Sequence, residues 1–192
     1  MSKIYTKAGD HGDTGYLGAG RIRKDSPRVR ALGALDETNS ALGVVLATEG
    51  LPESIRETIR RIQNDLFEAG AAAASQTPDF AAALLEAETT WLESEIDRLE
   101  ATIPPLDRFI LPGGSAAGAQ LHWARTVCRR SEREVVTAFV DEQGREPLLR
   151  FVNRLSDALF VIARASNHAL GRPETTWESR GKSHGTSEEG QT

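Results

Sequence analysis

The chain has 192 residues, of which 39% are hydrophobic, and this length fits a single domain with a packed core. Its 28 acidic and 23 basic residues give a net charge of −5, which argues against nucleic acid or an anionic membrane as a partner bound through overall charge. Cys128 is the only cysteine, so an internal disulfide is excluded, and without a signal-peptide pattern or an apolar run of about 18 residues we expect a cytoplasmic protein with no membrane span.

The N-terminal segment 6–20, TKAGDHGDTGYLGAG, contains five glycines and shows no apolar period, so it predicts neither a helix nor a half-buried strand. Glycine leaves backbone N–H groups free to converge on phosphate oxygens. Thr6 and Thr14 add hydroxyl donors, and Lys7 and Lys24 add positive charge. The glycine spacing matches neither a Walker A loop nor a Rossmann turn. A phosphate-binding loop and a flexible arm both remain open from these residues.

Five amphipathic segments follow, each with apolar residues at helical spacing. The predicted helices start near 26–27 and 52–53, span about 84–99, run from 115 to 140, and follow the turn at Gly144 until the stop signal at 171–173. The second is expected to bury Ile55, Ile59, Ile62, Leu66 and Phe67. Because no strand alternation or internal repeat is apparent, we predict an all-α fold, a five-helix antiparallel bundle of the four-helix-bundle (ferritin-like) type.

The expected organisation is one domain in three parts. A glycine-rich arm covers residues 1–25, and the helical bundle covers residues 26–170. Residues 171–192 are predicted to be a disordered tail, because no apolar residue follows Trp177.

The fourth predicted helix carries a row of arginines, Arg125, Arg129 and Arg133, spaced four residues apart beside the apolar stripe. A ladder of structural ion pairs is the usual explanation for such a row. Across a bundle, the same row also forms a cationic wall suited to a polyphosphate. Polar residues near the apolar stripes of the first and fifth helices are candidates to pair with it: Asp36, Asn39, Asn153 and Asp157.

Other candidate sites are weaker. The histidines at 11, 122, 168 and 184 form no Glu-x-x-His pair, which argues against a ferritin-like di-iron site, and no protein metal ligand is assigned. Cys128 falls on the inward face and is interpreted as a buried thiol, although neighbouring arginines would lower its pKa. Phe109 lies in a Pro/Gly loop, where it either plugs the bundle end or faces a ligand.

Four segments in order resemble the PduO-type ATP:cob(I)alamin (corrinoid) adenosyltransferases: KIYTKAGDHGDTGYLGAGRIRKD, LGALDETNSALG, FILPGGS with ARTVCRRSERE, and FVNRLSDALFVIAR. The resemblance covers about Lys3 to Ala169. It implies a five-helix bundle that assembles as a homotrimer, with ATP bound between neighbouring subunits and the glycine-rich arm wrapped around the triphosphate.

The resemblance also implies roles for individual residues. Phe109 matches an aromatic residue that displaces the lower ligand of cob(II)alamin, and Asp36 and Arg125 match a pair that forms a salt bridge across subunits near this site. Together with Arg129 these are the expected catalytic residues. Ala8 stands where the family usually has threonine, and Ser131 where it has alanine. The implied ATP contacts are Thr6, Lys7, Ala8, Gly9, Thr14, Gly15, Lys24, Arg129, Arg130, Ser131, Glu132, Arg133 and Asn153.

The implied reaction transfers the 5′-deoxyadenosyl group of ATP to the cobalt of cob(I)alamin and releases triphosphate, with Mg²⁺ carried by the triphosphate. The expected partners are an electron-donating flavoprotein and an adenosylcobalamin-dependent enzyme. Three alternatives stay open: a carrier that delivers adenosylcobalamin to a mutase, a helical interaction module, and an ATP hydrolase. Intact Lys24, Arg129, Arg133 and Asn153 favour catalysis over a pure carrier, which needs no ATP site.

Overall fold

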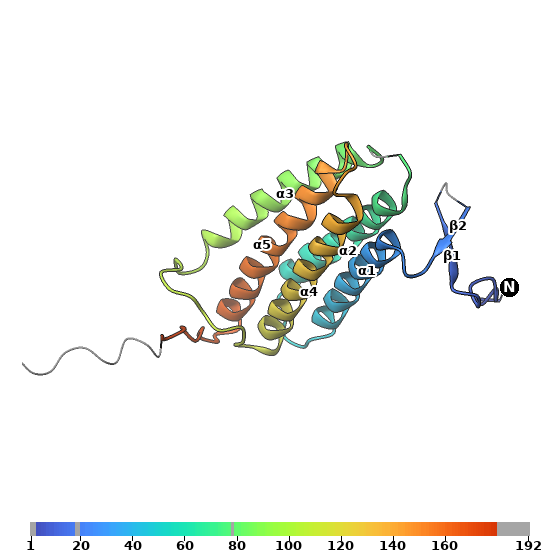
Figure 1. The fold of residues 1–192 in the computed structure, drawn as a ribbon. Helices are drawn as coiled ribbons and strands as arrows, with labels where there is room; N and C mark the ends of the chain where they lie inside the picture. The colour runs from blue at the N-terminus through green and yellow to red at the C-terminus, as the bar shows by residue number, and fades with distance from the viewer. Residues whose placement is uncertain (1–2, 18–19, 78, 180–192) are drawn as a thin grey trace, which may run out of the picture.

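The protein is a bundle of five long helices preceded by a short β-hairpin (Figure 1). A computed structural model describes residues 3–17, 20–77 and 79–179. Successive helices run in opposite directions, so the predicted antiparallel five-helix bundle is confirmed. None of the described helices is long and apolar enough to cross a membrane. The elements are β1 (Asp13–Tyr16), β2 (Gly20–Arg23), α1 (Pro27–Leu46), α2 (Glu53–Ala74), α3 (Ala82–Glu100), α4 (Ala116–Phe139) and α5 (Glu146–Ala169).

Local signals at the helix ends explain these boundaries. Ser26 caps α1, because its Oγ accepts a hydrogen bond from the N–H of Val29, and Pro27 occupies the first helical position. Ser115 caps α4 in the same way, accepting from the N–H of Gly118 at 2.9 Å. Gly144 and Gly171 follow α4 and α5 with φ of 85° and 62°, a left-handed backbone that favours glycine. Capping and turn chemistry therefore set the ends that the sequence predicted.

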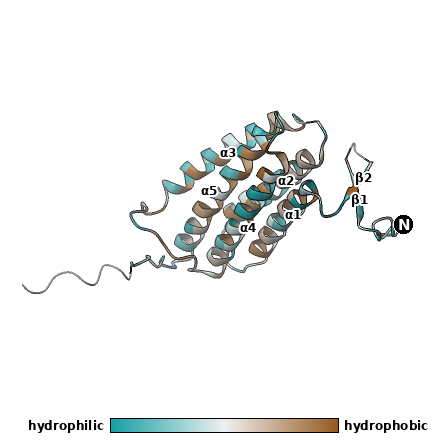
Figure 2. Cartoon of the chain, viewed as in Figure 1, coloured by the Kyte–Doolittle hydropathy of each residue, from teal (hydrophilic) through white to brown (hydrophobic). Residues whose placement is uncertain are grey.

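The core lies along the inward sides of the helices, with α4 packed between α1 and α5. Figure 2 shows hydrophobic and hydrophilic residues mixed along each helix, as expected when one side is buried. The apolar stripe predicted for α2 is buried from Ile55 to Leu66, but Phe67 is 72% exposed, so its expected burial was wrong. Successive residues of a helix are rotated by about 100°, so Phe67 lies outside the buried stripe, whose last residue is Leu66. Phe67 lines a groove between α1 and α2.

The hairpin corrects the expectation that the chain contains no strands. β1 and β2 pair antiparallel, with Thr14 opposite Ile22 and Tyr16 opposite Gly20. Among the described residues of the two strands, Tyr16 alone is buried, and its hydroxyl donates to the carbonyl of Ala73 at the end of α2. Because the hairpin packs through one side chain and not through a whole face, its sequence shows no alternation of apolar and polar residues.

A buried arginine closes the bundle end nearest the hairpin. Arg145 donates to the carbonyls of Ala72 and Ser75 at 2.7 Å, which satisfies backbone acceptors at the end of α2. Its Nε donates to Glu142 at 2.8 Å, and Glu142 also pairs with Arg28 on α1. Arg145 thus ties the start of α5 to α2 and, through Glu142, to α1.

The segment after α5 corrects the prediction of a disordered tail for residues 171–179. The N–H of Leu111 donates to the carbonyl of Thr175 at 2.8 Å, and the N–H of Trp177 donates to the carbonyl of Phe109 at 2.7 Å. The segment is held by backbone pairing, which needs no apolar side chains, and composition therefore did not reveal it. The rest of the predicted tail, residues 180–192, lies outside the described residues.

Candidate functional site

The arginine row lies along the outer side of α4, next to α5. Arg129 and Arg133 are exposed, and no carboxylate forms an ion pair with either of them within the described residues. They line, with Glu132, a shallow hollow of about 470 Å³. Of the two interpretations that the sequence left open, this arrangement favours the cationic wall, because an ion-pair ladder would have neutralised these guanidinium groups. Unpaired, exposed guanidinium groups on a rigid helix suit an anionic ligand.

The neighbours of this row on α4 point in different directions. Glu132 accepts a hydrogen bond at 2.7 Å from the amide of Asn153 on α5, so these two predicted residues meet beside the arginines. Arg130 turns toward α1, where it forms an ion pair with Glu37. Ser131 is fully buried, and its hydroxyl bonds to Thr38 and to the carbonyl of Ala34. The helical period places the Ser131 side chain between α1 and α4, and its contact with ATP stays a prediction.

Arg125 begins the row in a more enclosed place. Its guanidinium carbon lies 5.9 Å from the centre of the Phe160 ring on α5. Burial and the charge of Arg129 lower the pKa of Arg125. His122, one turn earlier and 2% exposed, packs against the same ring with centroids 5.8 Å apart. Neither ring nitrogen of His122, nor the Nε of Arg125, has a hydrogen-bond partner among the described residues.

Asp36 lies on the opposite side of α1 from α4. It is exposed and lines a groove of about 540 Å³ between α1 and α2, together with Asn39. The amide of Asn39 donates to the carbonyl of Gln63 at 3.0 Å, so Asn39 is committed to α2 and not to an arginine. No ion pair joins Asp36 to Arg125 within the described part of the chain.

The predicted arm residues fold into a compact loop in front of the hairpin. Lys24 closes this loop, donating from Nζ to the carbonyl of Gly9 at 2.9 Å and from its backbone N–H to Gly12 at 2.9 Å. Arg21 donates to the carbonyls of Ala8 and Asp13. The remaining arm residues of the prediction, all exposed or half-buried, lie in or beside the same loop: Thr6, Lys7, Thr14 and Gly15.

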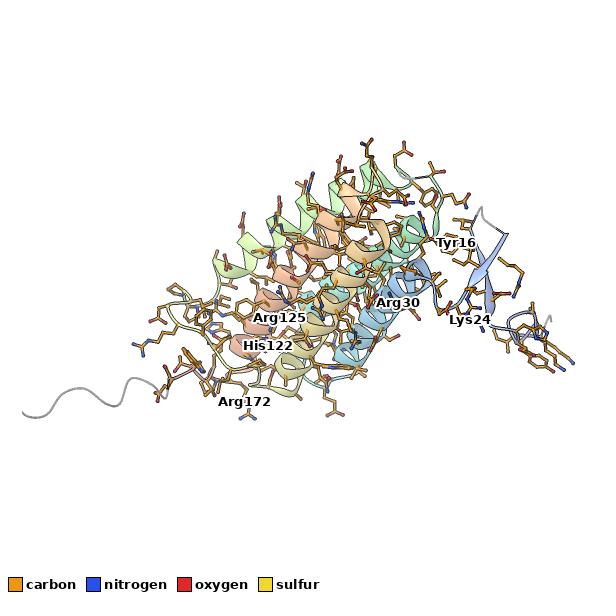
Figure 3. All side chains as sticks on the ribbon, in the orientation of Figure 1. Tyr16, Lys24, Arg30, His122, Arg125 and Arg172 are labelled. Atoms are coloured by element: carbon orange, nitrogen blue, oxygen red, sulfur yellow. The ribbon has the colours of Figure 1, made fainter. Side chains whose placement is uncertain are left out.

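The arm and the arginine row do not meet within one chain. Figure 3 shows Lys24 on the hairpin, beyond the end of the bundle, while Arg125 and His122 lie within the bundle on α4. Tyr16 anchors the hairpin to the end of α2, where its hydroxyl donates to the carbonyl of Ala73. Within the described residues of one protomer, no hydrogen bond or ion pair joins Arg129 or Arg133 to the residues of the arm.

Phe109 stands in the loop between α3 and α4, at the bundle end opposite the hairpin (Figure 1). Its side chain is 78% exposed, and its ring meets that of Trp177 edge-on with centroids 6.4 Å apart. The Phe109 side chain therefore does not fill the end of the bundle, which was one of the two roles that the sequence left open for it.

The remaining candidates are structural. Cys128 is fully buried, which confirms its interpretation as a buried thiol. Burial raises the pKa of this thiol, so the expectation that neighbouring arginines lower its pKa was wrong. Asp157 pairs with Arg154 at 3.0 Å and does not meet the arginine row. Within the described ranges, no group of three or more His, Cys, Asp or Glu residues is arranged to hold a metal ion.

The chain was compared with protein families, characterised proteins and solved structures. Residues 4–166 match the sequence model of the cobalamin adenosyltransferases. The chain belongs to the cobalamin adenosyltransferase family. A corrinoid adenosyltransferase of Bacillus subtilis is 43% identical over 179 residues, covering 92% of each chain. A cobalamin adenosyltransferase of Cupriavidus metallidurans is 41% identical and covers 93% of this chain and 95% of its own.

A solved structure extends the likeness to three dimensions. A variant PduO-type ATP:corrinoid adenosyltransferase from Lactobacillus reuteri, complexed with cobalamin and ATP, has a TM-score of 0.85 and 36% identity. It covers 92% of this chain, and this chain covers all of it. The resemblance identified from the four sequence segments is thus confirmed.

Several residues beside the site were not predicted for it. His122 and Phe160 enclose Arg125, and Arg21 holds the arm loop together. Trp177 contacts Phe109 from beyond the end of the family match at residue 166. The i, i+3 spacing of His122 and Arg125 was a usable signal, because it places both on one side of a helix.

Protonation of His122 should destabilise the bundle. Burial and the nearby Arg125 lower the pKa of His122 in the folded state, although Glu174 opposes this. The unfolded chain, with an imidazole pKa of about 6.5, then takes up the proton more readily, so stability falls as the pH drops below about 6.5. We expect His122→Leu to flatten this dependence by about 1 kcal/mol between pH values of about 7.5 and 5.5, measured by urea unfolding. The exposed His168 serves as the control, and an equal change in His168→Leu would contradict the assignment.

Proposed function

We propose that this protein transfers the 5′-deoxyadenosyl group of ATP to cob(I)alamin and releases triphosphate. The observation that carries the proposal is the exposed, unpaired pair Arg129 and Arg133 on α4, in a chain of the cobalamin adenosyltransferase family. Support also comes from the Lactobacillus reuteri neighbour, which was solved with cobalamin and ATP.

The chemistry is a displacement at the C5′ carbon of ATP. The electron pair of Co(I) forms a new Co–C bond, the C5′–O bond breaks, and the triphosphate leaves with the bonding electrons. Cobalt is thereby oxidised from Co(I) to Co(III). The attacking atom needs no general base, so the protein's tasks are to align cobalt with C5′ and to stabilise the charge that develops on the triphosphate.

The residues for the second task are cationic side chains that form no ion pair with a carboxylate within the described residues, although Nη1 of Arg133 donates to the carbonyl of Arg129 at 2.9 Å. Arg129 and Arg133 offer guanidinium donors, and Glu132 is engaged by Asn153 instead of neutralising them. The arm adds Lys24 and the backbone N–H groups of its glycine-rich loop. We place Mg²⁺ on the triphosphate, because its phosphate oxygens are the hard ligands that this ion prefers.

We propose that ATP binds between subunits of a homotrimer. Within the described residues of one protomer, no hydrogen bond or ion pair joins the arm to Arg129 or Arg133, so we propose that the arm supplies Lys24 to a triphosphate held by Arg129 and Arg133 of a neighbour. The same arrangement would bring Asp36, in its open groove, against Arg125 of another protomer.

Phe109 is proposed to act before the transfer step. An exposed aromatic ring on the loop can occupy the lower face of the corrin and displace the lower cobalt ligand, which makes cob(II)alamin easier to reduce by one electron. We therefore propose an electron-donating flavoprotein as the partner that supplies this electron, and an adenosylcobalamin-dependent enzyme as the partner that uses the product.

An anaerobic assay tests the transfer directly. The purified protein is mixed with chemically reduced cob(I)alamin and MgATP, and the visible spectrum is followed while triphosphate is quantified. We expect conversion to the spectrum of adenosylcobalamin with one triphosphate released per product. Binding of both substrates without conversion would favour a carrier, and inorganic phosphate without a corrinoid would indicate an ATP hydrolase.

Arg129→Ala should lower kcat/KM for the transfer by about 100-fold or more, because a charged donor to the leaving group is lost. Helix content should be unchanged, since Arg129 is exposed. Arg150→Ala, which removes an exposed arginine from α5, is the matched control. Equal activity of the two variants would contradict the role of Arg129.

Phe109→Ala should fail mainly at the reduction of cob(II)alamin. We expect the rate with cob(II)alamin and a reductant to fall at least about 10-fold, since four-coordinate cobalt no longer forms, and preformed cob(I)alamin to restore much of the activity. The two rates are measured side by side in the variant and the unmodified protein. An unchanged rate from cob(II)alamin would exclude the proposed role.

A further inference from the structure

The backbone of Phe109 is restrained although its side chain is exposed. The loop that carries it, residues 104–115, is rich in proline and glycine and contains exposed residues from Pro104 to Phe109. A loop of this kind is expected to move unless something outside it holds it. In this structure, α5 and the segment that follows it provide contacts to the beginning, middle and end of the loop.

The middle of the loop pairs with residues 175–177. Ile110 and Thr176 form an antiparallel bridge, flanked by hydrogen bonds from Leu111 N–H to Thr175 and from Trp177 N–H to Phe109. The Trp177 ring meets the Phe109 ring edge-on. These contacts surround the residue that the proposed function places against the corrin, and they leave most of its ring free.

Arg164 joins the start of the loop to the same segment. It lies on α5, its side chain is 4% exposed, and its Nε donates to the two carboxylate oxygens of Glu174 at 3.2 and 3.1 Å. Its Nη2 donates to the carbonyl of Pro104 at 2.8 Å. One buried guanidinium group therefore holds two segments that are far apart in sequence. Such a group is costly to bury unless all its partners stay in place.

Asn167, one turn further along α5, holds the end of the loop. Its Oδ1 accepts from the N–H and the hydroxyl of Ser115, each at 2.8 Å, and its Nδ2 donates to the carbonyl of Gly113 at 2.9 Å. A Cβ at Gly114 would lie 2.4 Å from the Asn167 amide, and Gly114 also has a φ of 97°. Glycine is thus required where the loop passes this anchor.

We propose that residues 174–177 form a strap that fixes the position of Phe109, with Trp177 as the positioning residue. The strap does not touch the reacting atoms. It holds the loop so that the exposed ring is presented to the corrin in one orientation, which matters because misplacement by about 1 Å can cost about 100-fold in rate. The inference rests on the proposed function of Phe109, whereas the coupling between strap and loop stands on the hydrogen bonds alone.

The experiment compares three full-length variants with the unmodified protein. Trp177→Ala removes the ring, Trp177→Phe keeps an aromatic ring, and Thr176→Ala is the control, because the bridge uses the backbone of its neighbours and its own side chain is exposed. The hydrogen-exchange rate of the Leu111 amide measures how firmly the strap holds the loop. The rates of adenosylation from cob(II)alamin with a reductant and from preformed cob(I)alamin measure the effect of the strap on the reaction.

We expect Trp177→Ala to speed exchange of the Leu111 amide about 10-fold and to slow the reaction from cob(II)alamin about 10-fold, while the rate from cob(I)alamin changes less than about 2-fold. Trp177→Phe and Thr176→Ala should behave like the unmodified protein. Unchanged exchange in Trp177→Ala would show that the Trp177 ring does not restrain the loop and would overturn its positioning role. Faster exchange with an unchanged rate from cob(II)alamin, or an equal loss of both rates, would overturn the positioning role.

The two hypotheses fail in different ways. If the unmodified protein makes no adenosylcobalamin even from cob(I)alamin, the proposed function is wrong, and the positioning role falls with it. The exchange comparison at Leu111 still decides whether the Trp177 ring helps to restrain the loop, because that measurement requires no corrinoid or ATP.

Discussion

The arrangement of this protein depends on the burial of one side of α4 between α1 and α5. Cys128, Ser131 and Val135 are completely enclosed on that side, so the rotation of the helix is determined by its core. With 3.6 residues per turn, the same rotation leaves Arg129 and Arg133 on the outside beside Asn153. Apolar packing therefore orients the cationic groups, and the electrostatic surface needs no ion pairs of its own to stay in position.

Two buried arginines hold the opposite ends of the bundle, Arg145 immediately before α5 and Arg164 on α5. Arg145 bonds to the last carbonyls of α2 near the hairpin, and Arg164 bonds to Pro104 and Glu174 near Phe109. Carbonyl groups at helix ends and in loops would otherwise bind water. Each arginine supplies fixed hydrogen-bond donors in place of that water. As a result, the two segments with expected ligand contacts, the arm and the Phe109 loop, both extend from well-anchored ends of the bundle (Figure 1).

The separation of these segments is itself informative about the chemistry. A corrin and a triphosphate are both large ligands. Lys24 lies beyond one end of the bundle and Arg125 lies within it on α4 (Figure 3), whereas Phe109 belongs to the loop between α3 and α4. The proposed site shared between subunits would bring such parts together without enlarging the chain. The groove of Asp36 between α1 and α2, with the exposed Phe67 beside it, offers an apolar surface for such a contact.

By itself, the sequence determined the five helices, the starts of two of them near Ser26 and Ser115, and the inward position of Cys128, because these follow from local start signals and a 3.6-residue period. Its ordered motifs also identified the family. The hairpin, the exposure of Phe67, the burial of Ser131 and the pairing of residues 175–177 with the Phe109 loop were decided only by the tertiary structure. Those features depend on which surfaces face each other and on backbone groups that pair across long sequence separations, and side-chain periodicity does not encode either.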